Sequence, residues 1–183
     1  FGSLVFVPGM TASYTGMLTF SANGPGNIID FSTVALNINN FQFNGTGEWT
    51  LNSDVDCSAL PFSTFTVIKG TLNTNDKTIS VSQFQSWPSE QRVINLGNST
   101  INCSQNFQIM DAATLTLNAG TSTINIGQTF FNVQGFTFYD VNFIPQFPGE
   151  VNFFGANNFH TLGLTDLKVY GIVFSSNELY QIY

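Results

Sequence analysis

The sequence predicts an all-β fold, specifically a right-handed parallel β-helix (β-solenoid) with about 21–24 residues per coil. Three observations lead to this prediction: a short phrase recurs at a nearly constant spacing, two further families of strand-like triplets recur with it, and turn-forming residues separate the families. Helices are not expected, because no segment keeps an apolar period of about 3.6 residues and β-branched and aromatic residues dominate.

The clearest repeat alternates polar and apolar residues around a Thr-Ile core. Its equivalent last positions are 24, 22 and 23 residues apart, at Cys57, Val81, Cys103 and Ile126. A period in this range indicates stacked supersecondary units, because a single unit cannot bury its own apolar edge. The inward column predicted beside it is Val55, Ile79, Ile101 and Ile124, and the outward column between them is Asp56, Ser80, Asn102 and Asn125.

Two further families of apolar–polar–apolar triplets give each coil three short strands. Their alternation has the period of two that is typical of half-buried strands. One family is Trp49–Leu51, Gly70–Leu72, Ile94–Leu96, Leu115–Leu117 and Phe136–Phe138, which predicts an outward column of Thr50, Thr71, Asn95, Thr116 and Thr137. The looser family is Phe65–Val67, Phe84, Phe107–Ile109 and Phe131–Val133.

Groups of Gly, Asn, Asp and Ser between the families predict the corners of the coils. These residues tolerate the positive φ angles that sharp turns require. Trp87 lies in residues 85–89, an insertion that accounts for the 24-residue step from Leu72 to Leu96. A right-handed coil follows from the general rule for parallel crossovers. The predicted corners are Asn52–Asp54, Asn73–Asp76, Gly97–Asn98 and Asn118–Gly120.

The length favours one domain, and we expect residues 1–183 to form a single β-helix domain of roughly six to eight coils. Residues 1–40 are less regular, and their strand-like parts at 4–7, 17–20 and 27–31 fit either a cap or two distorted coils. Residues 141–143, 151–153 and 167–169 keep the alternation near the other end. Because the chain begins with Phe and residues 179–183 still resemble a strand, we expect a segment of a longer chain.

The composition argues against several partners. Charged residues make up 8% of the chain, aromatic residues 15%, and the formal net charge is −7. Nucleic-acid binding needs clustered Lys and Arg, and only four such residues are present, scattered along the chain. Polyanionic membrane surfaces are disfavoured for the same reason. No apolar run approaches the roughly 18–20 residues of a membrane span.

Several runs resemble right-handed β-helix repeats of large bacterial surface and secreted proteins. These runs are residues 44–51, 70–75, 92–101 and 115–124, and residues 155–162 are similar to another recurring element of such arrays. The resemblance covers about residues 41 to 165, and such repeats occur especially in Bacteroidetes-type adhesins, with relatives in phage fibres. It implies a β-helix scaffold in an extracellular or cell-surface setting. It supplies no catalytic residue.

Three carboxylates form the best candidate for an ion or sugar site. Asp54 and Asp56 lie two residues apart at a predicted corner, and Asp76 falls near that corner on the next coil, beside Lys77. Clustered acids serve polysaccharide hydrolases and lyases and can bind Ca²⁺. The competing interpretation is an Asp-rich corner that is stabilised by hydrogen bonds to the backbone.

The other candidate residues point less clearly to a functional site. Trp87 could stack on a sugar ring, although a loop Trp also serves as a plug over a core edge. His160 is the only histidine and has no catalytic or zinc-binding motif around it, so we expect it to face solvent. Cys57 and Cys103 are predicted to be free buried thiols, because two coils would separate their backbones by about 9–10 Å, more than a disulfide spans. No catalytic residue, metal or cofactor is expected.

These observations favour a non-enzymatic, extracellular structural or adhesive β-solenoid module with weak carbohydrate binding. Its expected partners are other segments of the same or neighbouring chains and surface glycans. Two alternatives stay open. One is a polysaccharide-active β-helix enzyme, which needs clustered acids in a groove. The other is a phage tail-fibre or receptor-binding segment, which would trimerise through apolar columns such as Phe153-Phe154.

Overall fold

The computed structural model describes residues 1–31, 34, 36–87, 89–128, 130–144, 149–152, 157–164 and 167–170. Every helix or strand within these ranges is a β-strand, as the pattern of short alternating segments predicts. The strands are β1 (Leu4–Val5), β2 (Ala12–Phe20), β3 (Asn27–Asp30), β4 (Leu36–Leu51), β5 (Val55–Asp56), β6 (Thr64–Asn73), β7 (Thr78–Ser86), β8 (Arg92–Asn95), β9 (Thr100–Ile109), β10 (Leu115–Asn118), β11 (Thr123–Ile126), β12 (Phe130–Val133), β13 (Thr137–Phe143), β14 (Gly149–Asn152), β15 (Asn158–Leu164) and β16 (Leu167–Tyr170).

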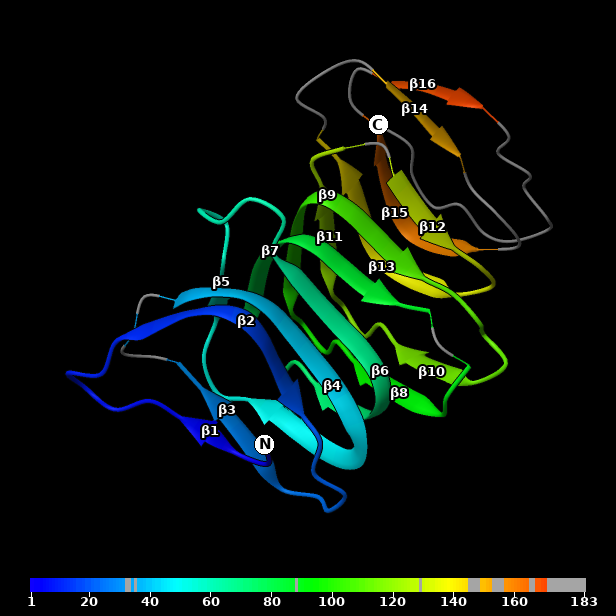
Figure 1. The fold of residues 1–183 in the computed structure, drawn as a ribbon. Coiled ribbons are helices and arrows are strands. Elements are labelled where there is room, and N and C mark those ends of the chain that lie inside the picture. The colour runs from blue at the N-terminus through cyan, green and yellow to red at the C-terminus, as the bar shows by residue number, and fades with distance from the viewer. Residues whose placement is uncertain are drawn as a thin grey trace.

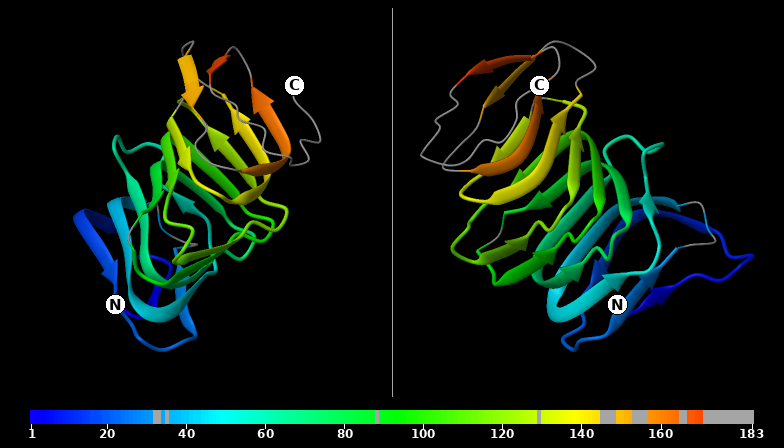
Figure 2. Two further views of the ribbon diagram at one scale, coloured as in Figure 1. Left: turned by 90° about the vertical axis from the view of Figure 1, so that its right-hand side faces the viewer. Right: turned by 180° about the vertical axis from the view of Figure 1, so that it is seen from behind.

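The strands wind into a parallel β-solenoid of about six turns. Figure 1 shows the coils stacked from the blue N-terminal end to the yellow and orange strands, and Figure 2 shows the same stack from the side and from behind. Strands that are one coil apart in the sequence lie side by side, so β7 pairs in parallel with β9 and β9 with β11. The fold predicted from the repeat is confirmed.

The register of the Thr-Ile repeat is the one that the sequence predicts. Ile79 pairs with Ile101, and Ile101 pairs with Ile124. The column continues into β13, where Val141 pairs with Ile124. All four side chains are fully buried, because a strand in this position points every second residue into the coil.

A column of phenylalanines forms the centre of the core. Consecutive ring centroids lie 5.8, 5.5, 5.3 and 5.6 Å apart, and the rings of the last three pairs are nearly parallel. Offset stacking of aromatic rings adds about 0.5–1.5 kcal/mol per pair beyond the burial of apolar surface. The column, which the looser triplet family predicts from Phe65 onward, is Phe41, Phe65, Phe84, Phe107 and Phe131.

The register predicted for the remaining family is wrong by two residues. Thr50 pairs with Asn73 rather than with Thr71, and Thr71 and Thr116 both pair with Val93. A shift of two residues keeps every side chain on its predicted face, so alternation alone cannot detect the error. In the true register the column of threonines becomes the column Thr50, Asn73, Asn95 and Asn118. Thr137 pairs instead with Asn158.

This correction also removes the insertion that the sequence places at Trp87. Leu72 pairs with Ile94, which is 22 residues later, so the coil has an ordinary length. The loop that contains Trp87 simply connects β7 to β8.

The corners between β6 and β7, β8 and β9, and β10 and β11 have a left-handed residue at one equivalent position. Asn75, Gly97 and Gly120 have φ angles of 52°, 56° and 59°. This confirms the prediction for three of the four corners. The Asn52–Asp54 corner connects its two paired strands with one residue fewer than each of the other three corners does. None of its residues has a positive φ.

The strands of the first 40 residues belong to the same parallel stack. β1 pairs with β3, and β2 pairs with β4 across an irregularity between Tyr14 and Met17. Near the other end, β14 and β16 form a separate two-stranded parallel sheet. Phe153-Phe154 and the strand expected at residues 179–183 lie outside the described residues.

Candidate functional site

Two ladders of side-chain hydrogen bonds run along the outside of the solenoid. The first amide ladder comprises Thr50, Asn73, Asn95 and Asn118. Asn95 Nδ2 donates to Asn73 Oδ1 at 2.6 Å, and Asn118 Nδ2 donates to Asn95 Oδ1 at 2.6 Å. The ladder forms because each Asn is the outward residue of its strand and parallel strands bring equivalent residues next to each other.

The second amide ladder comprises Ser80, Asn102, Asn125 and Asn142 and lies on β7, β9, β11 and β13. Asn102 Nδ2 donates to Ser80 Oγ at 3.1 Å, and Asn125 Nδ2 donates to Asn102 Oδ1 at 2.9 Å. Asn142 Nδ2 continues the chain to Asn125 Oδ1 at 3.1 Å. The sequence predicts the first three of these positions as one outward column, so that prediction is confirmed.

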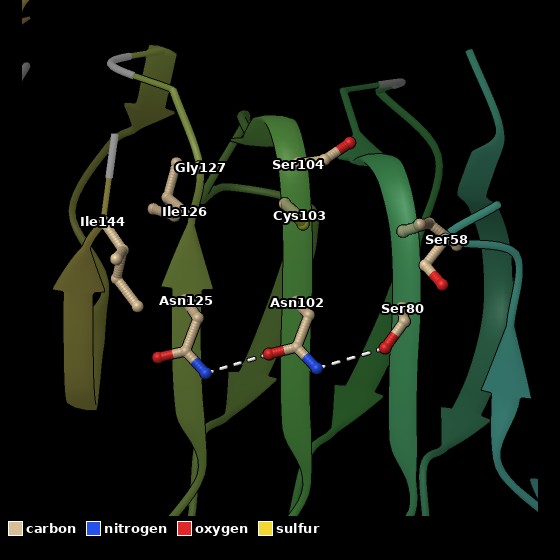
Figure 3. Close-up of a pocket in the computed structure, with 10 residues that line it drawn as sticks. Ser58, Ser80, Asn102, Cys103, Ser104, Asn125, Ile126, Gly127 and Ile144 are labelled. Carbon is tan, nitrogen blue, oxygen red and sulfur yellow. Dashed lines mark hydrogen bonds between the residues drawn. The ribbon is translucent and has the colours of Figure 1, made fainter. Parts of the chain in front are cut away.

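A shallow groove of about 340 Å³ opens beside the second amide ladder. Figure 3 shows it running across successive coils, from Ser58 at one end to Ile144 at the other. None of the side chains that line it is ionisable at neutral pH, since the pKa of the Cys103 thiol is raised to about 12 by burial. The lining residues are Ser58, Ser80, Val81, Asn102, Cys103, Ser104, Asn125, Ile126, Gly127 and Ile144.

The three candidate carboxylates each accept hydrogen bonds at a corner. Asp54 Oδ1 accepts from the backbone N–H of Thr78 at 2.8 Å, which joins it to the next coil. Asp76 Oδ1 accepts from the backbone N–H of Asn98 at 2.6 Å, also on the next coil. These contacts are those that the competing, structural interpretation of the cluster expects.

Asp56 is held in the same manner, by a residue of its own loop. Its Oδ1 accepts from the Oγ and the backbone N–H of Ser58, at 2.6 and 3.0 Å. These two hydrogen bonds lower the pKa of the Asp56 carboxyl, because they stabilise its charged form. Within the part of the chain that the structure describes, no three His, Cys, Asp or Glu side chains gather in a way that could hold a metal ion.

Trp87 lies directly after β7 and is 46% exposed. It does not line the groove, nor does any of Asp54, Asp56 and Asp76. The structure therefore places Asp54 and Asp76 at corners and Trp87 in a loop, and none of the three lines the groove. Asp56, at the end of β5, adjoins it, because it pairs with Ser80 and accepts hydrogen bonds from Ser58, and both of these residues line the groove.

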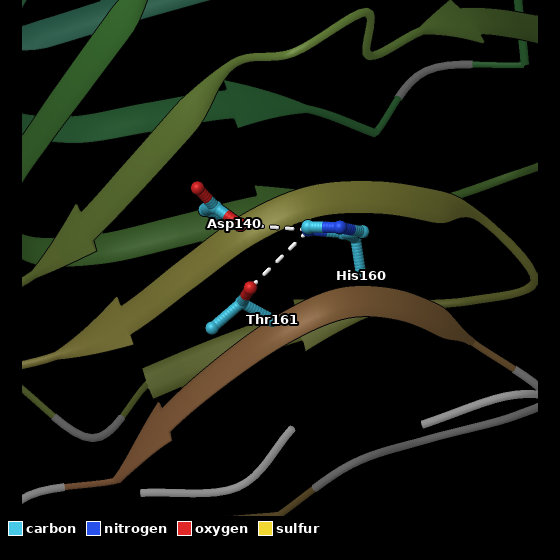
Figure 4. Close-up of polar contacts among 3 residues, drawn as sticks. All are labelled: Asp140, His160 and Thr161. Carbon is cyan, nitrogen blue, oxygen red and sulfur yellow. Dashed lines mark hydrogen bonds and ion pairs between the residues drawn. The ribbon is translucent and has the colours of Figure 1, made fainter. Parts of the chain in front are cut away.

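His160 faces solvent beside the buried Phe159, as the sequence predicts. Figure 4 shows its Nδ1 facing Asp140 Oδ1 at 3.3 Å and Thr161 Oγ1 at 3.2 Å. Its ring stacks on Tyr139 at a centroid distance of 4.1 Å. The register of β13 and β15 brings these residues together, since Asp140 pairs with Thr161.

The two thiols are free and buried, as predicted. Burial raises the pKa of Cys57 to about 12, and the nearby charge of Asp56 adds to the effect. Burial also raises the pKa of Cys103 to about 12. Only a thiolate is a good nucleophile, so both thiols are poor nucleophiles at neutral pH.

Arg92 is the polar residue that sequence reasoning misses. It is only 2% exposed, and it donates through Nε to Ser86 Oγ at 2.6 Å and through Nη1 to Thr114 Oγ1 at 2.8 Å. Further N–H groups reach the backbone oxygens of Ser86, Glu90 and Met110. Burial lowers the pKa of the Arg92 guanidinium, and the charge of Asp111 offsets part of this shift.

No helix of the described residues has the length and apolar character that crossing a membrane requires. Comparison of the chain with protein-family models, with curated proteins and with solved structures found no match. The structure thus shows the parallel β-solenoid, whereas the resemblance to repeats of bacterial adhesins and phage fibres stays a prediction from the sequence.

Proposed function

We propose that the chain is a non-enzymatic, extracellular structural and adhesive module: a stiff β-solenoid that presents neutral polar faces to other chain segments and to surface glycans. The observation that carries the proposal is that consecutive coils between β4 and β13 are joined both inside and outside the backbone. Phenylalanine rings stack inside, and the two amide ladders run outside. Such order along one axis makes the solenoid extended and stiff, although few of its residues are charged.

The hydrogen bonds of the carboxylates and the burial of the thiols support a non-enzymatic role. Asp54, Asp56 and Asp76 all accept hydrogen bonds that hold corners, and both thiols are kept protonated by burial. General acid–base chemistry on a glycan needs two carboxyl groups that face one substrate. The carboxylates at these corners instead bond to the backbone of their own or the next coil.

The outer faces support an adhesive role. Side-chain amides and hydroxyls dominate them, and these groups both donate and accept hydrogen bonds, as sugar hydroxyls do. The net charge of −7 opposes binding to polyanions, so among glycans a neutral one is a better partner than an anionic one.

The test is a pull-down on insoluble polysaccharides, followed by an assay for released reducing ends. We expect the folded chain to be retained, the heat-unfolded chain not to be, and no reducing ends to accumulate. Turnover would overturn the proposal in favour of a polysaccharide-active enzyme. A trimer in sedimentation equilibrium would overturn it in favour of a fibre segment.

A further inference from the structure

We propose that the groove beside the second amide ladder binds one strand of a neutral glycan, laid along the solenoid axis. This inference rests on the proposed adhesive function and assigns it to one site. Its elements are the unused hydrogen-bonding capacity of the ladder, the direction of the groove, and the character of its lining.

The ladder leaves half of its amide capacity unused. An Asn side chain has two N–H donors and an oxygen with two lone pairs. Asn102 spends one N–H on Ser80 and one lone pair on Asn125, and Asn125 spends one N–H on Asn102 and one lone pair on Asn142. Each of the two amides therefore keeps one donor and one acceptor for a ligand. The exposed hydroxyl of Ser104 lies at the same groove.

The direction of the groove suits a linear ligand with a repeating structure. It crosses β7, β9 and β11, which pair in register, so polar side chains recur about every 4.8 Å along the axis, with a hydroxyl on β7 and the same amide on β9 and β11. Figure 3 shows Asn102 and Asn125 side by side in the same orientation, with their hydrogen bonds parallel to the axis. A chain of sugar units presents hydroxyl groups at regular intervals along such a track.

The lining selects for a ligand that is uncharged and only partly polar. Ile144 is 58% exposed at one end of the groove, and Gly127 has no side chain to cover the floor. These residues offer an apolar surface to the C–H faces of sugar rings, while the amides meet the hydroxyls. A carboxylated glycan would bring charge to a groove that has no cation to pair with it.

Nuclear magnetic resonance of the ¹⁵N-labelled chain tests this site directly. The probes are cellohexaose, xylohexaose and mannohexaose, with oligogalacturonate as the anionic comparison. We expect at least one neutral hexasaccharide to shift the side-chain NH₂ signals of Asn102 and Asn125 and to leave those of Asn95 and Asn118 in place. Larger shifts at the first amide ladder, or tighter binding of oligogalacturonate, would overturn the inference.

A matched pair of variants separates the groove from the rest of the surface. Ser104→Trp fills the groove and keeps every residue of the second amide ladder, whereas Thr116→Trp adds the same ring at an exposed site on β10. We expect Ser104→Trp to weaken binding about tenfold or more and Thr116→Trp to leave it unchanged. Equal affinity of the two variants would overturn the site. If polysaccharide retention persisted in Ser104→Trp, the groove would be wrong while the adhesive function stood.

Discussion

Arg92 brings a positive charge into the interior of the solenoid. Taking a guanidinium out of water costs several kcal/mol, and this cost is offset only if its N–H groups find partners. The hydroxyls of Ser86 and Thr114 and three backbone oxygens provide them. Period-two alternation places Arg92 on the inward face with Ile94 and Leu96, but residue type points the other way, because an Arg next to Gln91 in a polar corner is typical of the surface.

Replacing Arg92 tests whether these hydrogen bonds hold the corner. Arg92→Met should lower the free energy of unfolding by about 1–3 kcal/mol, because buried carbonyl oxygens lose their donors. Urea denaturation monitored by circular dichroism measures the change. The half-buried Lys77→Met is the charge-matched control and should stay within about 0.5 kcal/mol of the wild type. A more stable Arg92→Met variant would mean that desolvation outweighs the hydrogen bonds.

The buried thiols make stability depend on pH in the alkaline range. In the unfolded chain each thiol titrates near its ordinary value of 9.0, whereas in the folded chain the pKa is about 12. Below pH 9 both states keep the proton and nothing changes. Between these values the unfolded state loses protons that the folded state retains, so stability falls as the pH rises, by up to about 1.4 kcal/mol per pH unit for each thiol.

The measurement compares urea unfolding of the wild type and of a Cys57→Ala, Cys103→Ala double variant across pH 8 to 11. All other side chains are the same in both proteins, so the comparison isolates the two thiols. We expect the decline of the wild type to be steeper, by up to about 2.7 kcal/mol per pH unit. Equal slopes would show that the thiols titrate normally in the folded state.

At the scale of elements, the sequence determines which residues point inward but not always which strands pair. The Thr-Ile phrase is distinctive, so Ile79, Ile101 and Ile124 align correctly. The Thr-Leu and Asn-Leu triplets resemble each other, and a slip of two residues keeps the same face, so the pattern alone predicts that Thr50 pairs with Thr71, whereas it pairs with Asn73. The hydrogen bonds of the asparagines settle the true register.

The groove shows a similar limit. Asn102 and Asn125 are identifiable from the sequence as outward residues of one column. Ser104, Gly127 and Ile144 are not identifiable in this way, because they line the groove only where their strands bend or end. Chemistry-bearing residues such as Asp54 and Trp87 attract attention in a sequence, whereas a site built from amides and a hydroxyl has no motif.

The left-handed corners make a prediction about glycine. A Cβ atom on Gly120, at φ 59°, would overlap the carbonyl oxygen of Gly97, whereas one on Gly135, at φ 74°, would meet only Ala112 at 3.8 Å. Gly135→Ala should therefore cost only the left-handed conformation, about 1–2 kcal/mol. Gly120→Ala should cost clearly more, because the corner must also move away from the coil beneath it. Thermal and urea unfolding of both variants gives the comparison, and equal losses would show that the corner can give way.

At the scale of the whole molecule, the described strands pair only with strands of neighbouring coils. The inner phenylalanine column and the outer amide ladders both connect one coil to the next, so the stability of a coil depends on how many neighbours it has. β9 pairs with β7, β11 and β12, whereas β1 pairs with β3 alone. Large apolar side chains are also exposed at this first end, namely Phe1, Val5, Val7, Met10 and Met17.

This arrangement predicts a gradient of protection in native-state hydrogen exchange. Amides of β9 and β11 should exchange only through global unfolding, whereas those of β1 and β2 should open at a lower free energy, because they lack a coil on one side. Phe84 lies in the middle of the ring column, 5.5 Å from Phe65 and 5.3 Å from Phe107. Phe84→Leu should therefore lower the protection of β6, β7 and β9 together, while the conservative Ile28→Leu in β3, near the first end, should leave them unchanged. Uniform exchange free energies from β1 to β15 would contradict this, since they would make the solenoid a single all-or-none unit rather than a stack of coupled coils.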